Sequence, residues 1–107
     1  MAWSAWIVFL AAALLEVGGD ATMRRGLRDG RWIPLLAGAC LLGLYGLVVN
    51  LVRWDFSKLL GVYVGVFALV SVLVGRYYWH ETIPASTWIG LILIVAGGLV
   101  IQFGPTR

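Results

Sequence analysis

Charged residues are scarce in this sequence, at 12% of its 107 residues, whereas hydrophobic residues make up 62%. A soluble domain carries about twice that share of charge, so the composition excludes an ordinary soluble protein. Lys and Arg exceed Asp and Glu by only three, too small a positive charge for a nucleic-acid-binding protein. The single cysteine, Cys40, cannot form an intrachain disulfide, and no group of Cys and His residues indicates a metal site.

Sequence motifs of enzymes are also missing. The chain has no glycine-rich phosphate loop, no Ser/His/Asp set and no HExxH motif. Its one histidine, His80, lies in a polar connection, where a solvated side chain is the simplest interpretation. We therefore expect neither enzymatic activity nor a bound cofactor.

Four apolar stretches fill most of the chain, and each approaches the length of about 20 residues that a helix needs to cross a membrane. The sequence predicts an all-α membrane protein, with residues 1–107 as one domain and transmembrane helices at about 3–22, 32–52, 59–79 and 86–103. The connections are short, so successive helices must be antiparallel. All six tryptophans fall at the expected edges of these helices, where an indole prefers the interface between lipid and water.

The charges in the connections predict orientation only weakly. The first and third connections carry five arginines and the opposite side carries three basic residues, which favours a mixed orientation or a mild excess with the first connection in the cytoplasm. A single orientation is the alternative. The first stretch does not resemble a cleavable signal peptide, because no Lys or Arg precedes it and Glu16 lies within it.

Glu16 is the only charged residue between Trp3 and Gly19. An ionised carboxylate facing lipid is costly, so this side chain must face protein, face a water-filled cavity or stay protonated. Such a carboxyl can exchange a proton for a cation, and we predict that Glu16 binds both. The alternative is a structural glutamate that hydrogen-bonds a neighbouring helix.

Other polar residues are placed near this acid. Asp20 lies four residues further on and shares a helix face with Glu16. An ion pair between Asp20 and Arg24 is the simpler prediction, and a second acid at the entrance of a cavity is the alternative. Tyr45 and Tyr63 have ring faces suited to cations, although packed or lipid-facing positions fit the sequence equally well.

Glycines are positioned where helices can bend or approach one another. Gly61 and Gly65 form a GVYVG segment in the third helix, which is a candidate bending point. Gly90 and Gly97 are seven residues apart and therefore share a face of the fourth helix. Small residues allow close helix contact in membranes, so this face is predicted to pack against another helix.

Four helices in one short chain, with one acid in the first, resemble the small multidrug resistance family. The similarity spans nearly the whole chain and includes Leu15-Glu16-Val17, Trp32-Ile33-Pro34 and Trp88-Ile89-Gly90. Within that family the chain is most similar to the YnfA-type branch. The segments that carry this likeness are Glu16-Val17-Gly18-Gly19, Gly26-Leu27-Arg28-Asp29-Gly30-Arg31, Leu44-Tyr45-Gly46, Asp55-Phe56-Ser57-Lys58 and Tyr63 with Gly65-Val66-Phe67.

The resemblance implies a proton-coupled exporter of small hydrophobic or quaternary cations in the inner membrane of a prokaryote, driven by the proton gradient. It implies an antiparallel homodimer of eight helices, so the partners are a second copy, the bilayer and the cation. By match, Glu16 binds proton and cation, and Tyr63 faces the substrate. Gly65 falls in the bending third helix, and Gly90 and Gly97 fall on the dimer face.

Three departures from the exporters bear on the substrate. Asp20 stands where a small or hydroxyl residue is usual, and Tyr63 stands where Trp is frequent. Val17 and Gly18 replace the Trp that follows the acid in guanidinium exporters, so guanidinium is a less expected substrate. The alternative function is a subunit of a lipid-carrier flippase or of a heteromeric small transporter. A non-transporting interaction protein is a third interpretation, against which Glu16 argues.

Overall fold

The computed structural model describes the backbone of residues 2–104 and the side chains of residues 4–104, and it is all-helical over that range. The four helices are α1 (Ala2–Asp29), α2 (Trp32–Val49), α3 (Phe56–Tyr77) and α4 (Ala85–Phe103). Each is long and apolar enough to cross a membrane. The all-α membrane architecture expected from the sequence is therefore confirmed.

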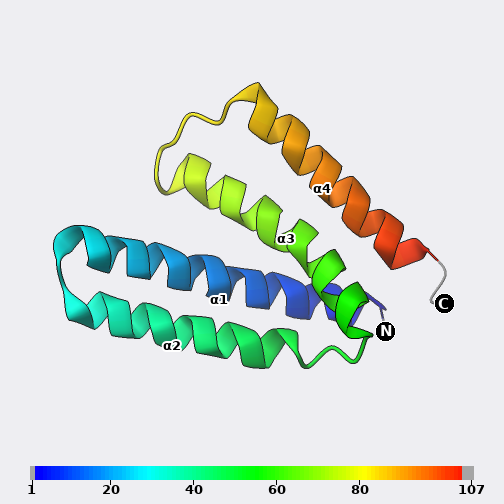
Figure 1. Cartoon of the computed structure of the whole chain (residues 1–107), viewed down its shortest axis with the longest axis horizontal. Coiled ribbons are helices and arrows are strands. Elements are labelled where there is room, and N and C mark those ends of the chain that lie inside the picture. Colours follow the sequence, from blue (N-terminus) through cyan, green and yellow to red (C-terminus); the bar gives the residue numbers. More distant parts are fainter. Residues whose placement is uncertain (1, 105–107) are drawn as a thin grey trace. The chain divides into compact units, whose positions relative to one another are not determined.

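The chain folds as two compact units, residues 1–52 and residues 53–107. The first unit is the antiparallel pair of α1 and α2, and the second is the antiparallel pair of α3 and α4 (Figure 1). Each helical hairpin has its own helix contact, and the single four-helix domain expected from the sequence stays a prediction.

α1 continues to Asp29, seven residues past the end expected at position 22. The intervening segment holds good helix formers such as Met23 and Leu27, and the first residue that breaks the helix is Gly30. Gly30 adopts a left-handed φ of 66°, and the Arg31 N–H then donates to the Gly26 carbonyl at 3.0 Å. This closes the helix in the manner typical of a C-terminal glycine. The arginine-rich segment expected in a loop is therefore helical.

The boundaries of α2 follow from local chemistry. The helix begins at Trp32 after an extended Arg31, and Pro34 is tolerated because first-turn N–H groups have no partner within the helix. α2 ends at Val49, three residues before the expected 52. There the Asn50 side-chain N–H donates to the Gly46 carbonyl at 2.8 Å, which covers one of the unpaired carbonyls of the last turn.

α3 begins at Phe56, three residues earlier than expected, and ends in a tight turn after Tyr77. His80 has a φ of 57°, which is unusual for a residue other than glycine. The Glu81 N–H donates back to the Gly75 carbonyl at 2.9 Å. This turn leads through an extended Pro84 into α4.

Glycine brings α3 and α4 together. A methyl group added to Gly61 would lie 2.7 Å from Ile101 Cδ1, and one added to Gly65 would lie 3.7 Å from Val95 Cα. The Ile101 side chain of α4 thus covers Gly61 and the backbone of α4 passes close to Gly65, while α3 is one uninterrupted helix through both glycines. In this structure Gly61 and Gly65 have a packing role, and the predicted bending at these residues stays a prediction.

Gly90 and Gly97, the two glycines expected at a dimer face, do not take part in the contact between α3 and α4. A methyl group on Gly90 or Gly97 would meet no atom within 4 Å. Gly98, by contrast, lies against the backbone of Gly61 and Val62, at 3.7 to 3.9 Å from the added methyl group. Gly90 and Gly97 therefore lie outside the α3–α4 contact, and their place at a dimer face stays a prediction.

Candidate functional site

The contact between α1 and α2 follows a regular seam. A methyl group added to Gly38 would lie 2.8 Å from the Gly19 carbonyl oxygen and would collide with the Met23 side chain. The contacting positions are Gly19, Met23 and Gly26 on α1 with Leu42, Gly38 and Leu35 on α2. They are three and four residues apart in both helices, which keeps them on one face of each. Backbone is in contact with backbone along this seam.

Glu16 and Tyr45 occupy the next step of the seam. Glu16 lies three residues before Gly19, and Tyr45 lies three residues after Leu42. The register of the seam, which sets Gly19 against Leu42 and Met23 against Gly38, therefore places Glu16 on α1 level with Tyr45 on α2. Both side chains are partly buried. The fold thus brings together one acid and one phenol, two of the residues predicted from sequence, within the apolar part of the hairpin.

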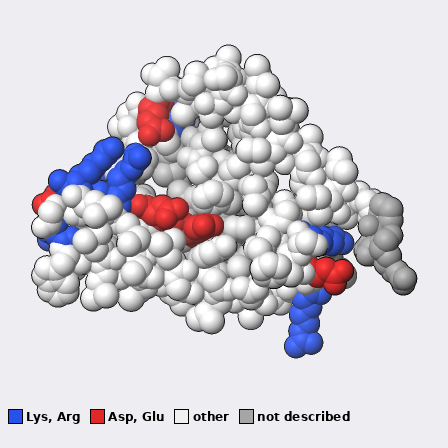
Figure 2. Space-filling model, in the orientation of Figure 1, with Lys and Arg blue, Asp and Glu red and all other residues white. Residues whose placement is uncertain are grey.

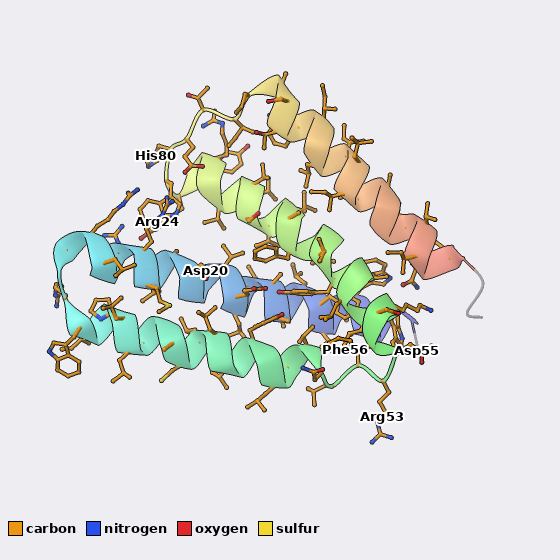
Figure 3. All side chains as sticks on the ribbon, in the orientation of Figure 1. Asp20, Arg24, Arg53, Asp55, Phe56 and His80 are labelled. Atoms are coloured by element: carbon orange, nitrogen blue, oxygen red, sulfur yellow. The ribbon has the colours of Figure 1, made fainter. Side chains whose placement is uncertain are left out.

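Asp20 lies outside this pair. Asp20 and Arg24, labelled on α1 in Figure 3, are both exposed, and neither is one of the α1 positions that contact α2 in the seam. One helical turn separates these two residues, as the predicted ion pair requires. Asp20 is therefore placed beside Glu16 along α1 but outside the seam.

Tyr63 belongs to the second hairpin and is only 3% exposed. Its ring centroid lies 6.3 Å from that of Phe67, with the ring planes tilted by 32°. Aromatic packing within α3 therefore positions the Tyr63 side chain. The role of Tyr63 beside Glu16 stays a prediction.

Sequence reasoning missed the glycines of the seam and one polar side chain. Gly19 and Gly26 are seven residues apart, the same spacing that drew attention to Gly90 and Gly97, and this signal could have identified them. Gln102, in the last turn of α4, has a buried Oε1 without a hydrogen-bond partner in the described part of the chain. Between residues 4 and 104, no three His, Cys, Asp or Glu side chains gather as metal ligands would.

Comparisons with known proteins agree with this architecture. Residues 3–107 match the family described as "Uncharacterised BCR, YnfA/UPF0060 family". The UPF0060 membrane protein YfjF of Bacillus subtilis is 33% identical, over 92% of this chain and 93% of its own length. A UPF0060 membrane protein of Streptomyces avermitilis is 34% identical, over 92% of this chain and 89% of its own length. No solved structure matches the chain significantly. The chain belongs to the YnfA/UPF0060 family of membrane proteins.

Proposed function

We propose that this protein is a proton-coupled antiporter that exports small hydrophobic or quaternary organic cations across a bacterial inner membrane. In this proposal Glu16 binds proton and cation in turn. The observation that carries the proposal is the partly buried side chain of Glu16 within the membrane-spanning part of α1, level with Tyr45 of α2 in the register of the seam.

The chemistry of such a carboxyl supports exchange. In a medium of low dielectric constant, a carboxylate needs a bound proton or a neighbouring cation to balance its charge. The Tyr45 hydroxyl can donate a hydrogen bond to the ionised form, and the Tyr45 ring face is suited to a lipophilic cation. A cation that reaches Glu16 therefore replaces the proton.

Assembly as an antiparallel homodimer completes this proposal. Two copies would bring two Glu16 carboxyls to one cavity, and their repulsion would disfavour a state in which both are ionised. The open glycine positions on α4, Gly90 and Gly97, support a close helix contact between copies. The resemblance to the small multidrug resistance family supports the same arrangement. Alternating exposure of the shared site to the two sides would let the proton gradient drive export.

Proton release tests the proposal directly. Purified protein in weakly buffered detergent solution receives tetraphenylphosphonium or another quaternary cation, and a pH indicator records released protons. We expect release from the wild type and none from Glu16→Gln, which keeps the size and hydrogen bonding of the side chain but cannot titrate. Asp20→Asn is the matched control, with a smaller effect because Asp20 is exposed.

Two results would contradict the proposal. Equal proton release from Glu16→Gln and the wild type would assign the carboxyl a structural role. An absence of release with every cation, together with recovery of a second, different chain from native membranes, would favour a subunit of a flippase or heteromeric transporter instead.

A further inference from the structure

We propose that the arginine-rich end of α1 binds the headgroup phosphate of an anionic phospholipid. This arginine cluster consists of Arg24, Arg25, Arg28 and Arg31, and all four side chains are exposed. In Figure 2 these arginines are the blue side chains at the end of the first hairpin that carries the α1–α2 turn. The inference concerns the lipid surroundings of the protein and does not depend on the proposed transport activity.

The helix seam determines the depth of the cluster. Gly26 lies against Leu35 and Met23 lies against Gly38, so Arg24 and Arg25 are level with the apolar α2 segment between Leu35 and Gly38. That segment is preceded by Trp32, which is 70% exposed at the first position of α2. An exposed indole at a helix end marks the membrane interface. The side chains of Arg24 and Arg25 therefore start from the membrane side of Trp32, whereas Arg31 precedes Trp32 in the turn.

The length of α1 leads to the same depth. Its 28 residues span about 42 Å, compared with about 30 Å for the hydrocarbon core. The last turns of α1 consequently pass through the headgroup region rather than an aqueous loop. Arginine side chains at this depth extend toward the interface, and the anionic groups they meet there are lipid phosphates.

The spacing of the arginines fits one phosphate group. Arg24 and Arg28 are four residues apart and therefore neighbours on one face of the helix. A guanidinium group pairs with phosphate oxygens through two parallel hydrogen bonds. Leu27, 71% exposed on the same turn, offers apolar surface for an acyl chain. Two guanidinium groups and an apolar neighbour thus match the parts of a phospholipid.

Net charge selects an anionic lipid. Residues 20–31 carry four arginines and two aspartates, so the segment has a net charge of +2. A phosphatidylglycerol headgroup keeps its negative charge, whereas the choline of phosphatidylcholine cancels it. The cluster therefore discriminates between two lipids that have the same phosphate group.

Electron paramagnetic resonance with spin-labelled lipids tests this proposal on the full chain in phosphatidylcholine membranes. The measured quantity is the ratio of association constants for spin-labelled phosphatidylglycerol and phosphatidylcholine. We expect the wild type to prefer phosphatidylglycerol, and the variant Arg24→Gln/Arg28→Gln to lose up to about fivefold in this ratio for each arginine removed. Arg24→Lys/Arg28→Lys should retain most of the preference because it keeps the charge.

The matched control is Arg53→Gln. Arg53 lies in the connection between α2 and α3. It is also exposed, and its side chain extends away from the helices (Figure 3). An equal loss in this control would overturn the proposal, as would a wild type without preference. Displacement of the labelled lipid by an equal concentration of inorganic phosphate would show a site for free anions instead. If the double glutamine variant fails to fold, salt titration of the wild type decides, because high salt must weaken an ionic preference.

Discussion

Replacing Gly38 by alanine probes the contact between α1 and α2. The added methyl group would lie 2.8 Å from the Gly19 carbonyl oxygen and 3.0 Å from the Met23 backbone nitrogen. Both neighbours are backbone atoms, which cannot rotate away. The two helices must therefore separate by about half an ångström to reach normal contact distances, and overpacking of this kind costs about 1–3 kcal/mol.

Gly43→Ala is the matched control for this prediction. Gly43 lies on the same helix, but a methyl group there would meet no atom within 4 Å. Both substitutions raise intrinsic helix propensity equally, so the difference between them isolates the contact. We expect Gly38→Ala to unfold at lower denaturant concentration in mild detergent, with a difference of about 1–3 kcal/mol in the free energy of unfolding. Equal stability of the two variants would refute the close approach of the helices at this position.

Three further substitutions test other parts of the structure. Gly61→Ala places a methyl group 2.7 Å from Ile101 Cδ1, the end of a flexible side chain that can rotate away, so it should lower the thermal unfolding temperature less than Gly38→Ala does; an equal or larger loss would show that Ile101 is held in place. His80→Gly removes a left-handed backbone conformation and should raise the unfolding free energy by up to about 1 kcal/mol; a decrease would show that the side chain stabilises the turn. Gln102→Leu removes a buried acceptor that has no partner in the described structure, so unfolding in detergent should be unchanged or harder. A loss of assembly would instead indicate that another copy donates to Gln102.

The sequence was sufficient to predict the architecture because membrane spans depend on apolar length, which composition reveals directly. Helix ends were less predictable. The polar residues around Arg24 and Arg28 suggested a loop. The helix nevertheless continues through them, because their helix propensity is favourable until Gly30. Charge and helicity are separate properties, and in α1 the glycine at position 30 ends the helix rather than the arginines before it.

The candidate site was predictable in part. Glu16 was identified because an acid within an apolar run is costly, a local property of the sequence. That Tyr45 lies level with Glu16 follows from the register of α1 against α2. This register is set by the contacts of Gly19 with Leu42 and of Met23 with Gly38. Register arises from three-dimensional packing and was not readable from residue types alone. The same reason explains why Gly98, rather than Gly97, faces α3.

Cation transport into proteoliposomes under an imposed proton gradient tests the central claim most directly. Vesicles with an acidic interior contain purified protein, and the measured quantity is uptake of a labelled quaternary cation in exchange for protons. The account predicts accumulation against the cation gradient by the wild type, slower accumulation by Asp20→Asn and none by Glu16→Gln, with all three proteins equally helical. Uphill accumulation by Glu16→Gln at the rate of the wild type would contradict the assignment of this carboxyl as the shared site for proton and cation.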